Sequence, residues 1–125
     1  MEIFHNLQLA TLYPEVLVQA SVYIENGNTA LSLLDPYTGE TIAHASVNVL
    51  PLTDYKTVLI KDWGENEGVF SWLIENNILE PCPSLDTSTG YVVARGAQII
   101  HEELLLQAQT IQQEWMDSIT PFNLY

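Results

Sequence analysis

The densest group of ionisable side chains in the sequence is an acidic run in which Asp62, Glu65 and Glu67 lie close together. Paired carboxylates can carry out general acid–base chemistry or bind a hard cation. The spacing D-x-x-E-x-E supplies fewer oxygen ligands than a calcium-binding loop. We therefore interpret the run as an exposed turn that begins a helix and is capped by Glu65 or Asn66, because acids favour the positive helix N-terminus. An anionic docking surface for a basic partner is the alternative.

The other reactive residues form no recognisable catalytic set. Cys82 lies between two prolines with no base near it in the sequence, so we interpret it as a packed or incidental thiol. His101 precedes Glu102 and Glu103, but adjacent helix residues point about 100° apart and rarely share one metal ion. The motifs of common hydrolases and nucleotide-binding enzymes are missing from the sequence. We expect no catalytic residue, no metal site and no cofactor, whereas a deep pocket lined by His44 or His101 would favour an enzyme or a small-molecule binder.

The net charge limits the plausible partners. Sixteen aspartates and glutamates face three lysines and arginines, which gives −13 at pH 7. Such a chain is repelled by nucleic acids and anionic lipids, because contacts with phosphate need cationic side chains. It is steered instead toward basic protein surfaces, in which nucleic-acid-binding proteins are rich. A folded chain of this mass exposes roughly 6,700 Å², so imitation of DNA requires that the acids gather on one ridge.

Alternating apolar and polar residues predict a three-stranded antiparallel meander over residues 16–49. Asn26 and Gly27, between two alternating runs, are typical of a type I′ hairpin turn, because both residues tolerate a positive φ. Residues 1–15 are expected to form an edge strand or a packed arm, whose continuation Pro14 limits. The expected strands cover residues 16–24, 29–34 and 40–49, with a second turn at 35–39.

A buried strand, a helix and a fifth strand are expected next. Residues 57–61 are apolar enough for a strand that is buried on both faces. The helix at residues 68–77 is apolar on nearly all sides, so it must be largely enclosed. A loop at residues 81–89 separates this helix from a strand at residues 90–97.

The C-terminal helix is expected over residues 100–118, before Pro121 stops it. Its apolar stripe consists of Leu104, Ala108, Ile111 and Trp115. A polar stripe on the other side consists of Glu103, Gln107, Thr110, Glu114 and Asp117. The tail at residues 122–125 is apolar enough to dock against another surface.

These elements predict an α+β fold, in which an antiparallel sheet of about five strands carries a short buried helix and a longer C-terminal amphipathic helix. At 125 residues the chain has the size of one domain, residues 1–125. No apolar run is long enough to span a membrane, and no basic region precedes an apolar run at the N-terminus. A single cysteine cannot form an internal disulfide, so we expect a cytoplasmic location.

Residues 60–68, I-K-D-W-G-E-N-E-G, resemble a motif of small uncharacterised proteins from bacterial mobile elements. In that motif a strand ends in lysine, followed by Asp or Asn, an aromatic residue and Glu-Asn-Glu-Gly before a short apolar helix. The resemblance extends over residues 58–78. It implies a plasmid, transposon or phage setting and carries no known activity or catalytic residue.

Charge and resemblance together favour a non-enzymatic interaction protein. The leading hypothesis is a mobile-element inhibitor of a host defence nuclease, of the restriction or CRISPR type, that mimics nucleic acid on a basic protein surface and binds neither nucleic acid nor membrane. Trp63 belongs to the predicted interface because an aromatic beside acids is typical of binding hot spots, with core packing as the alternative. The predicted partner-binding residues are Asp62, Trp63, Glu65, Glu67, Glu102, Glu103, Glu114 and Asp117. The competing hypothesis is a structural or regulatory module, either a homo-oligomer or an adaptor, whose charge serves only solubility.

Overall fold

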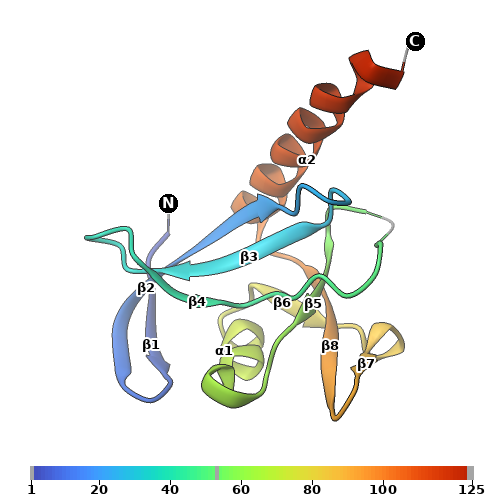
Figure 1. Cartoon of the computed structure of the whole chain (residues 1–125). Helices are drawn as coiled ribbons and strands as arrows, with labels where there is room; N and C mark the ends of the chain where they lie inside the picture. Colours follow the sequence, from blue (N-terminus) through green and yellow to red (C-terminus); the bar gives the residue numbers. More distant parts are fainter. Residues whose placement is uncertain (1, 53, 124–125) are drawn as a thin grey trace.

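The computed structural model describes residues 2–52 and 54–123, with side chains for residues 2–52 and 54–119. Within these residues the strands are β1 (Phe4–Gln8), β2 (Leu12–Val22), β3 (Thr29–Leu34), β4 (Thr41–His44), β5 (Thr57–Ile60), β6 (Leu79–Pro81), β7 (Thr87–Thr89) and β8 (Val92–Ile99) (Figure 1). The helices are α1 (Val69–Glu75) and α2 (Glu102–Asn123), and two short 3-10 turns are η1 (Gly64–Asn66) and η2 (Pro83–Leu85).

The strands build two antiparallel sheets of four strands each. The first sheet has the order β1-β2-β3-β4, and in the second sheet β8 pairs with β5, β6 and β7. The segment after β4 joins the sheets, because Ser46 forms a bridge to Ile60 and the N–H of Val47 donates to the carbonyl of Leu59. The predicted α+β class is confirmed. The strand number exceeds the expected five by three. β1 lies in the region expected to form an edge strand or a packed arm, and the short strands β6 and β7 lie in and beside the region predicted to be a loop at 81–89.

The short helix α1 is enclosed, as its apolar pattern predicts. Its buried residues are Val69, Phe70, Trp72 and Leu73, whereas Ser71 and Glu75 are exposed. The Trp72 indole donates from Nε1 to the carbonyl of His5 at 2.9 Å, and its ring meets the ring of Phe4 edge-on. α1 therefore contacts β1 at the lower side of the molecule, while α2 rises from the upper side (Figure 1).

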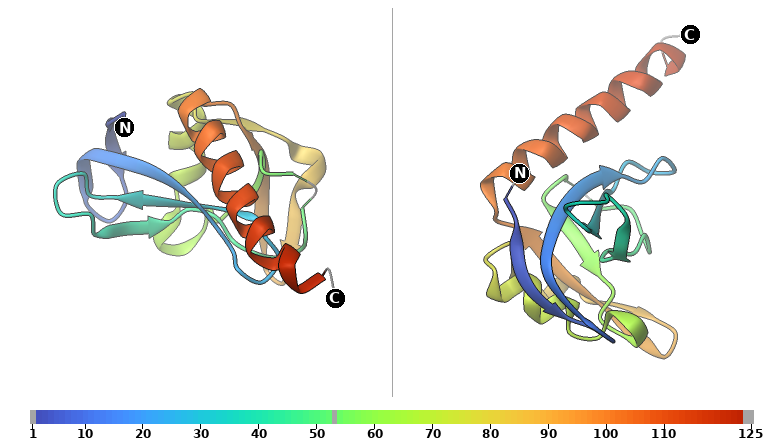
Figure 2. Two further views of the ribbon diagram at one scale, coloured as in Figure 1. Left: turned by 90° about the horizontal axis from the view of Figure 1, so that it is seen from above. Right: turned by 90° about the vertical axis from the view of Figure 1, so that its left-hand side faces the viewer.

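The long helix α2 covers the part of β2 that lies beyond β1. β1 pairs with residues 12–16 of β2, and α2 takes its place along the rest of the strand (Figure 2). The Gln107 side chain accepts a hydrogen bond from the N–H of Ala20 at its Oε1 atom, at 2.7 Å. Leu104 and Ala108 of the predicted apolar stripe are buried on the same side. A helix thus protects a sheet edge with both apolar packing and a polar side chain.

The turn between β2 and β3 is wider than the predicted type I′ turn. Tyr23 donates to the carbonyl of Asn28 and accepts from the N–H of Gly27, and Asn26 does not have the positive φ that a type I′ turn requires. Gly27 has a φ of +77°, and a Cβ atom at this position would lie 2.5 Å from the ring of Trp115. Both the left-handed backbone and the close approach of α2 therefore require glycine there.

Three further predictions about element ends are wrong. β2 runs through Pro14, because the pairs on both sides of the proline continue the ladder with β1. β4 ends at His44 instead of continuing to residue 49, because the following segment, residues 45–47, turns toward β5. α2 continues through Pro121 to Asn123 instead of stopping at the proline.

Candidate functional site

The acidic turn, residues 62–68, connects β5 to α1 and is organised by Asp62. Its Oδ1 atom accepts hydrogen bonds from the N–H groups of Gly68 at 3.1 Å and Phe70 at 3.2 Å. The predicted capping by Glu65 or Asn66 is therefore wrong: Asp62 reaches across the turn and occupies the first helical N–H groups. Half-exposed Asp62 thus has a structural role whether or not a partner contacts it.

The exposed part of the acidic turn consists of Glu65 and Glu67, with Trp63 beside them. Lys61 forms an ion pair with Glu65, and its Nζ lies 5.9 Å from the centroid of the Trp63 ring. The hydrogen bond from Lys61 lowers the pKa of the Glu65 carboxyl, so this side chain is ionised well below neutral pH. Trp63 is half-buried, so its exposure lies between that of an interface residue and that of a core residue, the two roles predicted for it.

The predicted acids of α2 are all exposed and lie at two places along the helix. Glu102 and Glu103 lie in the first helical turn, while Glu114 and Asp117 lie in the distal half of the helix. That distal half and α1, which follows the acidic turn, lie at opposite ends of the molecule (Figures 1 and 2). The structure therefore does not bring Glu114 and Asp117 onto one ridge with the acidic turn.

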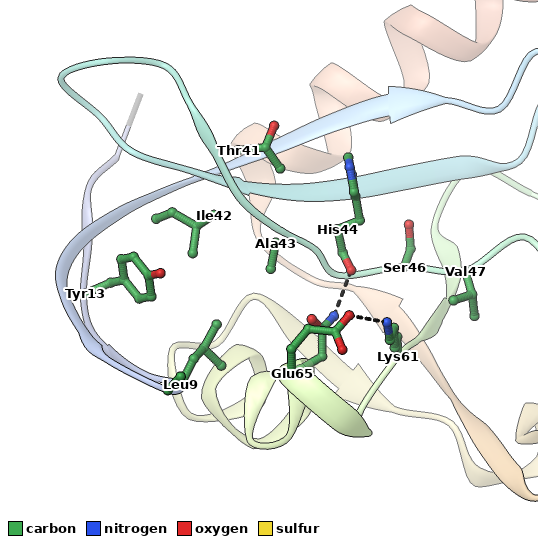
Figure 3. A pocket seen from close by; sticks show the side chains of 12 residues that line it. Leu9, Tyr13, Thr41, Ile42, Ala43, His44, Ser46, Val47, Lys61 and Glu65 are labelled. Atoms are coloured by element: carbon green, nitrogen blue, oxygen red, sulfur yellow. Dashed lines mark hydrogen bonds and ion pairs between the residues drawn. The ribbon is translucent and has the colours of Figure 1, made fainter.

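A groove of about 590 Å³ lies beside β4 and the acidic turn, and we name it the β4 groove. It lies between the tip of the β1–β2 hairpin, β4 and η1 (Figure 3). The lining residues are Leu9, Ala10, Tyr13, Thr41, Ile42, Ala43, His44, Ser46, Val47, Lys61, Glu65 and Asn66. A smaller hollow of about 280 Å³ adjoins it, shares Leu9, Ala10 and Glu65, and adds Glu67. The groove thus has an apolar floor and an acidic end.

Asn66 fixes one end of the groove to the edge of β4. Its side chain is buried, and its Nδ2 donates to the carbonyl of His44 at 2.8 Å. β4 is the last strand of the first sheet, so this contact is made on the side opposite β3. The free side of β4 therefore faces the β4 groove and η1 (Figure 3).

His44 and His101 lie apart and have different hydrogen-bond partners. The His44 ring points away from the β4 groove, and its Nδ1 lies 3.5 Å from Ser32 Oγ, at the outer limit of a hydrogen bond (Figure 3). His101 Nδ1 accepts from the N–H of Leu104, and His101 Nε2 lies 2.9 Å from a carboxylate oxygen of Glu2, so this ring organises the start of α2. Within residues 2–52 and 54–123, no three His, Cys, Asp or Glu side chains are placed to hold a metal ion.

Comparison with known proteins gives no family to which the chain can be assigned. No protein-family model, curated protein or solved structure matches it. Among the described helices, none is both long and apolar enough to cross a bilayer. Function must therefore be inferred from the charge and geometry of this chain alone.

Apart from Glu65, sequence reasoning did not predict the residues of the β4 groove as a binding site. They come from three segments that are distant along the chain, namely residues 9–13, 41–47 and 61–66. The one available signal was the pair of partly exposed apolar residues Leu9 and Tyr13 in a segment without a clear periodicity. Nothing in the sequence indicates that this segment folds back beside β4.

Proposed function

We propose that this protein is a non-enzymatic interaction protein that binds a basic surface of a partner protein. The observation that carries the proposal is uncompensated negative charge. Three lysines and arginines can pair one to one with at most three of the sixteen acids, which leaves at least thirteen (16 − 3) without such a partner. Two of the three basic residues are already engaged, Lys61 with Glu65 and Arg95 with Asp86.

A nucleic-acid-binding defence enzyme, such as a restriction or CRISPR nuclease, is the partner class that we propose. Such enzymes present basic surfaces that attract an acidic protein over a distance of about a Debye length. The resemblance of residues 60–68 to a mobile-element motif supports the same setting. We favour electrostatic docking over a copy of the DNA duplex, because the acids of the turn and of distal α2 lie at opposite ends of the molecule.

Capture of partners from a bacterial lysate at two salt concentrations tests this function. We expect a partner that is held at about 0.1 M salt and released at about 1 M, where the Debye length falls from roughly 10 Å to 3 Å. The partner should be a nucleic-acid-binding protein whose DNA cleavage slows when the acidic protein is added. If no basic protein is captured at the lower salt concentration, the proposal is wrong.

A pair of charge-reversal variants locates the interface. Glu65→Lys with Glu67→Lys should weaken binding of the captured partner, because both side chains are exposed beside Trp63. Glu75→Lys with Glu80→Lys changes the net charge equally at other exposed sites and is the matched control. Equal weakening by the two variants would remove the acidic turn from the interface.

An adaptor or homo-oligomer that binds through apolar contacts is the second candidate. Leu106 on α2 is 61% exposed, and Met116 and Ile119 are also exposed on the same helix. A partner or dimer that persists at about 1 M salt would favour this candidate. The predicted docking of the tail, residues 122–125, concerns side chains outside those that the structure describes.

A further inference from the structure

The two edges of the first sheet differ in the side chains that contact their backbone. Along β1 and β2, side chains from both helices contact the backbone: Trp72 donates to the carbonyl of His5, and Gln107 accepts from the N–H of Ala20. Along β4, Asn66 contacts the carbonyl of the last residue, His44, and the preceding residues 41–43 line the β4 groove. A hollow therefore lies where a further strand would add to the sheet.

We propose that the β4 groove receives an extended segment of the basic partner, which adds to β4 as a fifth strand of the first sheet. Strand addition uses backbone hydrogen bonds for affinity and side-chain pockets for specificity. Because Asn66 already donates to the carbonyl of His44, the part of β4 left for an added strand is residues 41–43, and a strand of that length is about 10 Å long. The proposal rests on the proposed function in one respect, namely that the partner is basic.

The lining of the groove defines the chemistry of this segment. Leu9, Tyr13 and Ile42 are partly buried apolar residues that can pack against an apolar side chain of the segment. Glu67 is exposed at the acidic end, where it can pair with a lysine or arginine of the segment, whereas Glu65 beside it is already ion-paired with Lys61 of the groove lining. The segment therefore alternates apolar and basic residues, since successive side chains of a strand point to opposite faces.

Charge argues against a second copy of this chain as the occupant of the β4 groove. A second copy of this chain would bring another net charge of −13 to the acidic end of the groove. Like charges directly opposed at an interface are unfavourable, whereas a basic segment is attracted. A basic partner is therefore the occupant that the surface fits.

Binding of a defined peptide probe tests the mode of docking. The probe is a short synthetic peptide of alternating lysine and valine, and the controls are a block peptide of equal composition and an alternating peptide with methylated backbone nitrogens. We expect the probe to shift the amide resonances of residues 41–44, 9–13 and 65–67, and to bind about tenfold or more tightly than either control. Equal binding of all three peptides, or shifts confined to α2, would overturn strand addition.

A charge-matched pair of variants tests the location. Ala10→Arg places a cation in the groove lining at an exposed site, and Gln109→Arg adds the same charge on the exposed side of α2. We expect Ala10→Arg to weaken the alternating peptide about tenfold and Gln109→Arg to weaken it less than about twofold. Thermal unfolding of both variants checks that the fold is retained.

The outcomes separate this inference from the proposed function. If both variants weaken the peptide equally, only the net charge acts and the groove is not the docking site. If no peptide binds while a lysate partner is still captured in a salt-sensitive way, the groove inference fails and the proposed function stands. If neither binds, both fail.

Discussion

The two edges of the first sheet differ in what covers their backbone, one edge being the part of β2 beyond β1 and the other being β4. On one side, α2 lies along β2, and Gln107 supplies a side-chain oxygen to the N–H of Ala20. On the other side, β4 is contacted at one end by the buried Asn66 and is otherwise flanked by a groove of about 590 Å³. The first edge is filled by the chain itself, and the second has room for another chain.

This difference separates structural polar residues from those available for binding. Gln107 belongs to the predicted polar stripe of α2, yet its side-chain oxygen accepts a hydrogen bond from the backbone of the sheet. Asn66 belongs to the acidic turn, yet it is buried and holds the turn against β4. The exposed acids Glu65 and Glu67 lie next to the edge that remains open. Variants that open a covered edge should therefore reduce stability, and variants at the open edge should change binding.

The largest effect is expected for Trp72→Ala, which removes the cover of β1. The substitution deletes a buried aromatic ring and the donor to His5, so we expect a loss of about 3–5 kcal/mol in the free energy of unfolding. Urea unfolding measures this loss. Trp63→Ala is the matched control, because Trp63 is half-exposed and its removal should cost less than about 1 kcal/mol. Equal losses would show that α1 does not protect this edge.

A smaller effect is expected for Asn66→Ala, which detaches the acidic turn from β4. The buried Asn66 side chain is lost and the carbonyl of His44 loses its donor, so stability should fall by about 1–3 kcal/mol. Urea unfolding measures the fall, and hydrogen exchange should become faster in residues 41–44. Unchanged exchange in these residues would contradict the view that Asn66 holds this edge.

Gln107→Met is expected to have a still smaller effect on the covered edge. Methionine keeps most of the volume but removes the acceptor of the Ala20 N–H, so a loss of about 1 kcal/mol is expected. The Ala20 amide should then exchange faster with solvent, as measured by NMR. Gln109→Met, on the exposed side of α2, should leave both stability and exchange unchanged.

The smallest effect concerns the protonation of Glu65 at the open edge. The folded-state pKa of Glu65 is lowered, first by the hydrogen bond from Lys61, so its contribution to stability exists above the unfolded pKa and disappears as pH falls through the folded pKa. Lys61→Met should raise the pKa of Glu65 toward its ordinary value. An NMR titration of the Glu65 carboxyl carbon measures this change, and an unaltered titration curve would show that Lys61 does not set it.

Local patterns predicted much of the scaffold. Alternation located β3 at its observed bounds, and the apolar run at residues 57–61 located β5. The stripe containing Leu104 and Ala108 correctly placed the face of α2 that packs on β2. These elements were predictable because each depends on a periodic pattern within one segment.

The edges and the groove could not be predicted, because they depend on contacts between distant segments. The position of Gln107 in a polar stripe does not show that it accepts a hydrogen bond from β2. Asp62 accepts a hydrogen bond from Gly68, six residues further along the chain, which its local sequence does not indicate. Imitation of DNA required that the acids gather on one ridge, but nothing in their spacing determines the direction in which α2 leaves the sheets. The proposed interface therefore omits the predicted acids of α2 and lies near Glu65 and Glu67.

The cover that α2 provides for β2 has a consequence for the order of events during synthesis. The described strands of the first sheet, residues 4–44, lie far ahead of α2 in the chain, so this sheet can form on the ribosome before the residues that protect β2 have emerged. During that interval the outer edge of β2 is a template for pairing with neighbouring nascent chains. The net charge of −13 repels such chains from one another until Gln107 reaches Ala20.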